Sequence, residues 1–287
     1  MMIVGIIFTS LSLGAMLETY SQAALTRAFS LVAGAAFVLG LLGLIGLEKR
    51  NGAIKPGAGE NYSWGEMLQA LTGNPQVTRF FWYLVLLLTA ILGQDILLEP
   101  FGAEAFGMAV DQTTRITSIW GTLFLLALVL GGALENRVPK MTQARLGTWL
   151  GMISFSVIVA SAGMGGKHVF YIGVVLLGFA TGLSTVSNLS LMLDMTTAGN
   201  VGLFIGAWGM ANAASRLAGN MLSGVVRDAV TQIFHDAVLG YTAVFGIEII
   251  MLLASLLILQ KVDVRVFQQR AEETLPYAER AAIASEG

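Results

Sequence analysis

Long hydrophobic runs separated by shorter polar connections dominate the chain. A membrane-spanning helix needs about 20 predominantly apolar residues, and eight runs come close to that length or exceed it. They cover residues 1–17, 26–47, 80–99, 116–134, 146–163, 169–193, 202–226 and 238–260. The first run has no basic segment before it and no small-residue cleavage site after it, so we expect a true span and not a signal peptide. The pattern predicts an all-α membrane protein with eight transmembrane helices.

Composition supports this class and removes several kinds of chemistry. Of the residues, 55% are hydrophobic and 12% charged, and the mean hydropathy is +0.74; a soluble domain carries about 25% charged residues. There is no cysteine, and the two histidines fall in connections without a second ligand at metal spacing, so we expect no metal site. No phosphate-binding loop, nucleophile elbow or basic aromatic patch is present, so we expect neither an enzyme nor a nucleic-acid partner.

The longest internal connection divides the chain. It contains a Gly/Pro-rich part followed by a short amphipathic segment with Ser63 as N-cap and Glu66 three residues later, which predicts a helix on the membrane surface. The predicted units are a two-helix unit (1–47), a cytoplasmic linker (48–79), a six-helix bundle (80–262) and a cytoplasmic tail (263–287). Two spans, a linker and six spans are what remains of a twelve-span, two-bundle transporter without its first four spans.

Basic residues predict the orientation in the membrane. Lysines and arginines in the connections divide eleven to four between the two sides, with Arg216 inside a span. Because cytoplasmic connections carry the excess of positive charge, both termini are expected to be cytoplasmic.

A polar segment, residues 93–108, ends the third span. It places Gln94, Asp95, Glu99 and Glu104 close together between apolar runs. A charged side chain at bilayer depth costs about 2.5–3.5 kcal/mol on insertion scales, so it usually faces protein, water or ligand. Asp95 and Glu99 are four residues apart, which predicts one helical face. We expect Gln94, Asp95 and Glu99 to line a site for a ligand or partner.

The alternative is a polar helix end that reaches the headgroup layer, which suits Glu104. Pro100 and Gly102 are expected to end the helix at this point. The residues leave both interpretations open.

The seventh span carries a stripe of polar and aromatic side chains. Trp208, Asn212, Arg216 and Asn220 recur every four residues and wind slowly around the helix. We expect them to line an internal cavity; the alternative is interhelical packing. Close packing itself is predicted by small residues spaced four apart, namely Gly178 and Gly182, Gly202 and Gly206, and Ala207 and Ala211.

Arg216 needs a partner at its depth. It lies about ten residues from the outer end of its span, or ~15 Å. Glu248 lies at a similar depth in the next, antiparallel span, so an Arg216–Glu248 ion pair is the first expectation. Asp95, closer to its outer end, is the second, and contact with water or ligand is the third.

Three segments carry a resemblance to a known family. They are GQDILLEPFGAEAFGM (93–108), TTRITSIWG (113–121) and GLFIGAWGMANAASRLAG (202–219). They resemble the bacteriochlorophyll-delivery branch of the major facilitator superfamily, the PucC-like proteins. The connection at 131–147 is also similar to a Gly-rich, acidic-then-basic loop of major facilitator transporters.

The resemblance implies a major-facilitator-type carboxy-terminal six-helix bundle, plus the last two helices of the amino-terminal bundle. It also implies an assembly factor for light-harvesting complexes in a photosynthetic membrane. Its partners would be the lipid bilayer, light-harvesting or photosystem polypeptides, and chlorophyll or bacteriochlorophyll as pigment. The alternatives are a proton-coupled transporter of a small solute, with Asp95 or Glu248 as the protonatable group, and a structural subunit of a photosynthetic complex. Independent transport is not expected without the first four spans.

Overall fold

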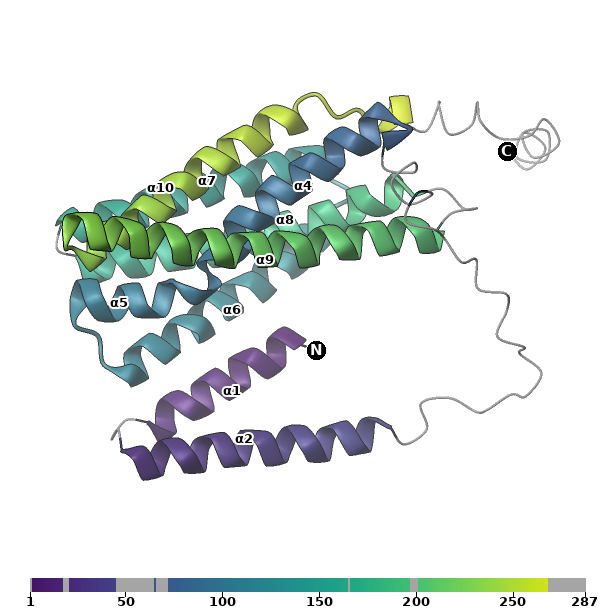
Figure 1. The fold of residues 1–287 in the computed structure, drawn as a ribbon. Helices are drawn as coiled ribbons and strands as arrows, with labels where there is room; N and C mark the ends of the chain where they lie inside the picture. The colour runs from purple at the N-terminus through teal and green to yellow at the C-terminus, as the bar shows by residue number, and fades with distance from the viewer. Residues whose placement is uncertain are drawn as a thin grey trace.

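The structure is a computed structural model of the chain that describes residues 2–17, 21–44, 65, 72–164, 166–196 and 201–267. All elements in these ranges are helical (Figure 1). They are α1 (Met2–Met16), α2 (Gln22–Gly43), α4 (Pro75–Gly93), the 3-10 helix η1 (Gln94–Ile96), α5 (Leu98–Phe106), α6 (Val110–Ala133), α7 (Lys140–Met164), α8 (Lys167–Asp194), α9 (Val201–Phe234) and α10 (Ala237–Leu259). The eight predicted runs correspond to the eight long helices, and η1 and α5 are additional.

Polar residues set the starts of several helices. The side chains of Ser21, Asn74 and Asp236 accept hydrogen bonds from the first free backbone N–H groups of α2, α4 and α10. Such caps satisfy donors that have no partner inside the helix. Pro75 follows Asn74 at the first helical position, where its missing N–H costs nothing.

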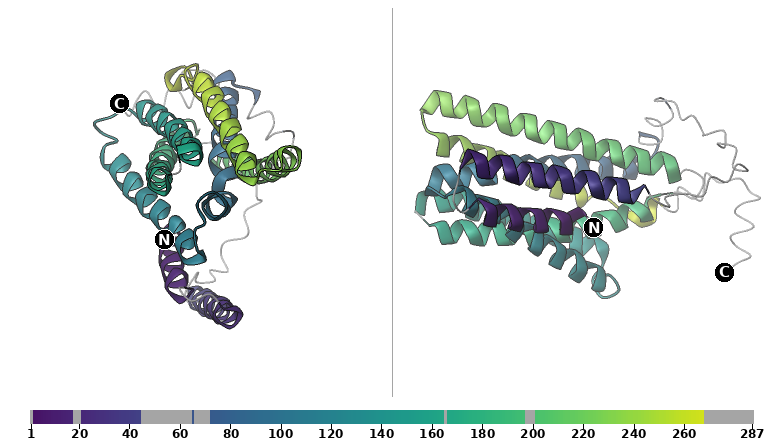
Figure 2. Two further views of the ribbon diagram at one scale, coloured as in Figure 1. Left: turned by 90° about the vertical axis from the view of Figure 1, so that its left-hand side faces the viewer. Right: turned by 90° about the horizontal axis from the view of Figure 1, so that it is seen from below.

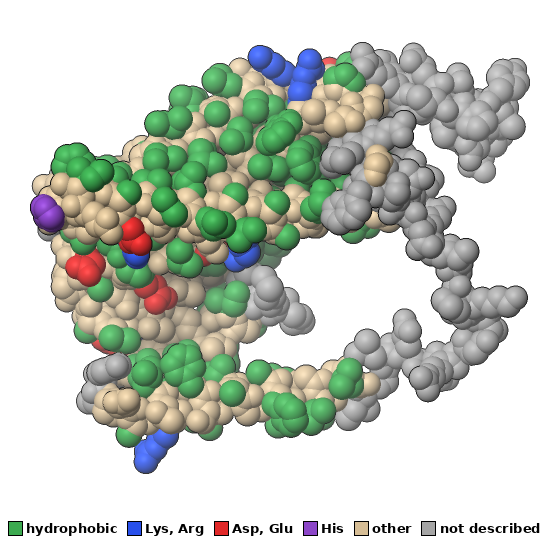
Figure 3. Space-filling model, viewed as in Figure 1, with side chains coloured by type: hydrophobic (Ala, Val, Ile, Leu, Met, Phe, Trp, Pro, Cys, Tyr) green, Lys and Arg blue, Asp and Glu red, His purple; other side chains and the backbone are tan. Residues whose placement is uncertain are grey.

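Six of the described helices are long and apolar enough to cross a membrane. They are Gln22–Gly43, Pro75–Ile96, Val110–Ala133, Lys140–Gly163, Lys167–Asp194 and Ala237–Leu259. Many large apolar side chains on these helices are exposed, and they cover much of the visible face in Figure 3. Outward apolar side chains of this kind suit a lipid environment. The chain is therefore an integral membrane protein. The count of eight spans stays a prediction for α1 and α9, which are outside this set.

Two groups of three helices form the bundle. In one group α9 and α10 pack on α4, and in the other α6 and α7 pack on α8; α10 contacts α7 and joins the groups. Aromatic rings fill the space near α5, where Phe101 meets Phe170 at 5.5 Å and Phe245 at 5.4 Å between centroids. All three rings are buried.

Glycines allow α6 and α8 to approach closely. A Cβ built on Gly178 would lie 2.5 Å from the carbonyl oxygen of Trp120, and one on Gly182 would lie 2.8 Å from the Cβ of Ala127. The predicted packing role of Gly178 and Gly182 is confirmed. A Cβ on Gly202 or Gly206 would meet no atom of the described residues within 4 Å, so these two glycines do not mark a contact there.

The α1–α2 hairpin lies outside the two groups. Its first helix packs on α6, where the Ser10 hydroxyl donates to the Thr114 carbonyl at 2.6 Å and accepts from the Ser118 hydroxyl at 2.7 Å. Figures 1 and 2 show α2 beyond α1, away from the rest of the bundle. The hairpin does not insert between the other helices. Its assignment to a separate half, and the major-facilitator arrangement, stay predictions.

Two predicted features lie outside the described residues. One is the amphipathic helix that starts at Ser63, of which the structure describes Gly65 and the residues from Thr72 onward. The other is the part of the cytoplasmic tail that follows Phe267.

Candidate functional site

The polar segment 93–108 contains a break between two helices. α4 ends at Gly93, η1 turns the chain through Gln94–Ile96, and α5 starts at Leu98. Pro100 explains the break, because it has no N–H to donate to the carbonyl four residues earlier, which belongs to Ile96. We call residues 93–97 the helix break.

The prediction that Pro100 and Gly102 end the helix was wrong. Pro100 lies in the first turn of α5, where a proline is tolerated. Gly102 lies inside α5 and is buried. The helix ends at Gly107, which has φ +60° and so takes the left-handed conformation that a glycine adopts without steric cost.

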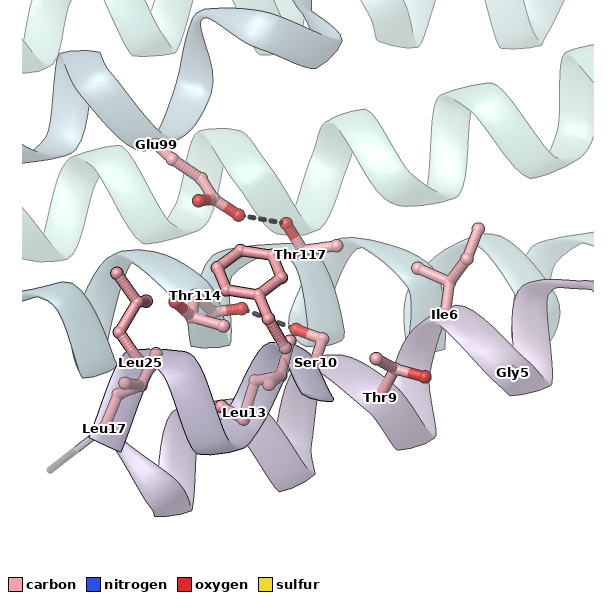
Figure 4. Close-up of a pocket in the computed structure, with 12 residues that line it drawn as sticks. Gly5, Ile6, Thr9, Ser10, Leu13, Leu17, Leu25, Glu99, Thr114 and Thr117 are labelled. Carbon is pink, nitrogen blue, oxygen red and sulfur yellow. Dashed lines mark hydrogen bonds between the residues drawn. The ribbon is translucent and has the colours of Figure 1, made fainter. Parts of the chain in front are cut away.

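The helix break separates Asp95 from Glu99. The two residues are not on one continuous α-helix, so the spacing of four no longer places them on one face. Asp95 faces α9, whereas Glu99 faces α6, where its Oε1 accepts a hydrogen bond from the Thr117 hydroxyl at 2.6 Å (Figure 4). The expectation that the two carboxylates share one helical face was therefore wrong, whereas a binding role for Gln94, Asp95 and Glu99 stays a prediction.

Asp95 and Arg216 form an ion pair between η1 and α9. Arg216 Nη1 lies 3.2 Å from Asp95 Oδ2. The Arg216 side chain is 53% exposed and that of Asp95 is 30% exposed. Gln94 is buried and its Nε2 donates to Asp95 Oδ1 at 3.0 Å. Gln94, Asp95 and Arg216 thus form one connected polar group at the surface of the bundle.

The prediction that Glu248 is the counter-ion of Arg216 was wrong. Glu248 is 1% exposed, and neither carboxylate oxygen has a hydrogen-bond partner among the described residues. The buried positions of α9 at this level include Ser215 and Gly219. Arg216 follows Ser215 by one residue, which is about 100° around the helix. Its side chain therefore projects beside the packed face, where Asp95 meets it.

The stripe on α9 does not line one cavity. Trp208 is buried and its ring meets that of Phe80 at 5.2 Å, edge to face, so it packs against α4. Asn212 is exposed, as Arg216 is, and Asn220 is half-buried. The four residues therefore occupy three different environments. Asn220 lies beside the site, since its Oδ1 is buried and has no partner among the described residues.

Several residues next to Glu248 were not predicted. Gly93 and Gly219 meet where α4 crosses α9, since a Cβ on Gly219 would lie 3.1 Å from Gly93 Cα. Ser223 is buried one turn further along α9, with no recorded partner for its hydroxyl within the described chain. The sequence signal was the spacing of four in Ser215, Gly219 and Ser223, which continues that of Ala207 and Ala211.

A pocket of about 570 Å³ lies between the α1–α2 hairpin, α5 and α6. We call it the Glu99 pocket. Apolar side chains of α1 and α2 form most of its walls, and Glu99, Thr114 and Thr117 line the opposite side (Figure 4). The Thr117 hydroxyl donates to one carboxylate oxygen of Glu99, and the other oxygen accepts no hydrogen bond from the described residues. Within the described chain, no group of three or more His, Cys, Asp or Glu residues is arranged to hold a metal ion.

The chain resembles known proteins along most of its length. Residues 1–267 match the family described as PUCC protein. Protein PucC of Rhodovulum sulfidophilum is 32% identical over 241 residues, covering 80% of this chain and 52% of that protein. Protein PucC of Cereibacter sphaeroides is 29% identical over 262 residues, covering 86% and 55%.

A third relative has a different name. The bacteriochlorophyll synthase 44.5 kDa chain of Rhodobacter capsulatus is 27% identical over 261 residues, covering 89% of this chain and 60% of that protein. The chain thus spans somewhat more than half the length of these curated relatives. The match over residues 1–267 is the evidence that the chain belongs to the PucC family.

Proposed function

We propose that this chain acts in the assembly of light-harvesting complexes in a photosynthetic membrane, and that it binds or delivers bacteriochlorophyll or chlorophyll. The observation that carries the proposal is the family match over residues 1–267. The name of the Rhodobacter capsulatus relative, which includes bacteriochlorophyll, supports the choice of pigment. The role proposed is binding and transfer without catalysis.

The Glu99 pocket suits the ring of a pigment in the chemistry of its walls. Its volume of about 570 Å³ is within the range of ligand pockets, which are mostly apolar with a few polar groups. Bound pigment would supply the light-absorbing ring and its magnesium. Glu99 would offer a carboxylate oxygen, the kind of ligand that magnesium prefers, and Thr117 would hold that carboxylate in place.

The Asp95–Arg216 pair is the proposed contact for an antenna polypeptide. Both side chains are partly exposed on a bundle whose surroundings are largely apolar. Polar groups at bilayer depth can bind a polar group on another helix. Gln94 would hold Asp95 in position for that contact.

The proposed orientation places both ends of the chain in the cytoplasm. Its support is the eleven-to-four division of basic residues between the two sides.

The test is purification of the chain in mild detergent from a photosynthetic host, with an absorption spectrum and identification of bound polypeptides. We expect bound pigment together with antenna polypeptides. Glu99→Gln should lower the pigment content, and Asp95→Asn should lower the antenna polypeptides. Glu104→Gln is the control, because Glu104 is an exposed carboxylate of α5 outside both sites. Pigment-free chain without antenna polypeptides would contradict the proposal.

Proton-coupled transport of a small solute is the second candidate function. The burial of Glu248 favours it, since an ionisable residue inside a membrane bundle is a common place for proton binding during transport. Its test is solute-driven proton flux in vesicles that contain the chain. Flux that Glu248→Gln or Asp95→Asn abolishes would favour transport over assembly, and absence of flux with every solute tried would remove it.

A further inference from the structure

Glu248 is a buried carboxylate with no partner among the described residues. Its side chain is 1% exposed and both oxygens are without hydrogen bonds. Arg216, a nearby cation on α9, is paired with Asp95 instead. Removing an isolated carboxylate from water costs several kcal/mol unless something compensates its charge. The structure therefore calls for a further positive group at Glu248.

Oxygen atoms from two helices converge at this place. The position that a Cβ of Gly93 would occupy lies 2.8 Å from Ser223 Oγ, 3.0 Å from Glu248 Oε1 and 3.3 Å from the Gly219 carbonyl oxygen. Gln94 Oε1 and Asn220 Oδ1, which belong to the residues directly after these two glycines, are also buried without partners within the described chain. The side-chain amide nitrogen of Gln94 donates its hydrogen bond to Asp95 and not to Glu248. The surroundings of Glu248 therefore offer several oxygen acceptors, and the donors on Ser223 and Asn220 are neutral groups that leave the charge of the carboxylate uncompensated.

The helix break adds negative electrostatic potential beside Glu248. α4 ends at Gly93, beside Glu248, and the carboxyl end of a helix carries partial negative charge on its last carbonyls. Interrupted helices in membrane transporters use such ends and unwound carbonyls to coordinate sodium ions or protons. Irregular backbone at membrane depth is expected where it is buried in protein or lines such a site.

The occupant can be chosen from charge and hydrogen-bond donors. A water molecule would donate two hydrogen bonds but would leave the charge of Glu248 uncompensated. A proton would neutralise the charge, yet it would supply a single donor to several oxygens. A metal cation neutralises the carboxylate and serves all the oxygens together. A calcium or magnesium site usually has more than one carboxylate or keeps several waters, so one buried carboxylate suits a monovalent ion.

We infer that Glu248, Ser223 and the helix break at Gly93 form a binding site for a sodium ion between α4, α9 and α10. Glu248 supplies the charge, and Ser223, Gln94 and Asn220 supply neutral oxygens. Glycine at 93 keeps the space open, because any side chain there would meet Ser223 and Glu248. The site does not depend on pigment binding or on antenna polypeptides.

The experiment measures thermal unfolding of the purified full chain in detergent while sodium chloride replaces choline chloride at constant ionic strength. Wild-type chain should unfold at a temperature that rises by several degrees and saturates with sodium, and potassium should produce no such rise. Binding of radioactive sodium should reach about one ion per chain, as expected for a one-site ligand that binds the folded state.

Variants identify the ligands. Glu248→Gln should abolish both the rise and sodium binding, and Ser223→Ala should weaken the affinity about tenfold, since it removes one neutral ligand. Ser255→Ala is the matched control: its hydroxyl is buried on α10 but already donates to the Leu252 carbonyl. It should retain the sodium response. If Glu248→Gln does not fold, the test is the comparison of the sodium responses of Ser223→Ala and Ser255→Ala.

Three results would overturn the inference. One is an equal rise with potassium, and another is a sodium response that Glu248→Gln and Ser223→Ala both retain. The third is an unfolding temperature that does not change with sodium, changes with pH in the wild-type chain, and does not change with pH in Glu248→Gln. That result would assign the site to a proton.

Discussion

Ionisable side chains occupy different places in the two groups of helices. In the α6–α7–α8 group they lie near the helix ends, where Lys140 Nζ is 2.9 Å from Asp194 and 3.3 Å from Glu135. In the α4–α9–α10 group, Arg216 and Glu248 lie well inside the helices. Charge at a helix end costs little because the headgroup layer and water are close, whereas charge inside a span is expensive. The difference shows that the α4–α9–α10 group holds Arg216 and Glu248 at positions where a charge is costly, whereas the Lys140 ion pairs of the α6–α7–α8 group lie where a charge is tolerated.

The largest effect should come from breaking the packing of the first group. Gly178→Ala places a Cβ 2.5 Å from the Trp120 carbonyl oxygen, a backbone atom that cannot turn away. We expect the free energy of unfolding to fall by about 1–3 kcal/mol, measured by thermal unfolding in detergent. Gly209→Ala is the control, because its Cβ would meet no described atom within 4 Å. There, alanine should be neutral or stabilising by up to ~1 kcal/mol. Equal effects at both positions would contradict the packing role.

Substitution of Glu248 is expected to raise the free energy of unfolding, whereas Gly178→Ala lowers it. Glu248→Met removes a buried carboxylate that has no partner among the described residues and keeps a side chain of similar length. In sodium-free buffer we expect the free energy of unfolding to rise by about 1–3 kcal/mol, the usual cost of an unsatisfied buried polar group. The measurement is again thermal unfolding. Ser255→Ala, which removes a satisfied hydroxyl from α10, should not stabilise the chain. A loss of stability in Glu248→Met would show that the carboxylate contributes to folding without sodium.

A smaller effect is expected at the exposed pair of the second group. The Asp95 side chain is 30% exposed and that of Arg216 is 53% exposed, so in detergent solution the water that reaches them weakens their attraction. A double-mutant cycle with Asp95→Asn and Arg216→Gln should give a coupling energy below ~1 kcal/mol in detergent. The charge swap, Asp95→Arg with Arg216→Glu, should recover part of what each single change loses. A coupling energy of several kcal/mol would mean that the pair is buried by something outside the described residues.

The sequence predicted the long helices well because each depends on local hydrophobicity. A run of about 20 apolar residues has few alternatives in a membrane, and all eight long helices appear at the predicted places. The short helix α5 was missed. Its proline at Pro100 indicated a helix end, although a proline is equally compatible with a helix start, and only the surroundings of Gly93 and Gly107 decide between the two.

The partner of Arg216 could not be predicted from depth alone. Depth follows from counting residues, and Glu248 does lie against the α4–α9 crossing, near Gly219. Rotation around the helix axis depends on which residues pack, and the sequence of α9 offers small residues on more than one face. The packed face runs through Ser215 and Gly219, so Arg216 projects toward Asp95.

The smallest effect is expected at Glu135, in the connection between α6 and α7. The Ser190 hydroxyl, which donates a hydrogen bond, and then the Lys140 ammonium hold the pKa of Glu135 below its ordinary value. The carboxylate therefore stabilises the folded chain above the unfolded pKa of about 4.3. This contribution is lost as the pH falls through the lower pKa of the folded state.

The exposed position of Glu135 limits this contribution, because solvent screens its interactions. We expect Glu135→Gln to unfold at a slightly lower temperature than the wild-type chain at pH 7, and the difference should disappear as the pH falls through the lowered pKa of the folded state. Thermal unfolding at a series of pH values measures it. Glu104→Gln, which removes an exposed carboxylate from α5, is the control for a change in net charge alone. A difference between wild-type chain and Glu135→Gln that grows as the pH falls would reverse the sign and contradict the assigned contacts with Ser190 and Lys140.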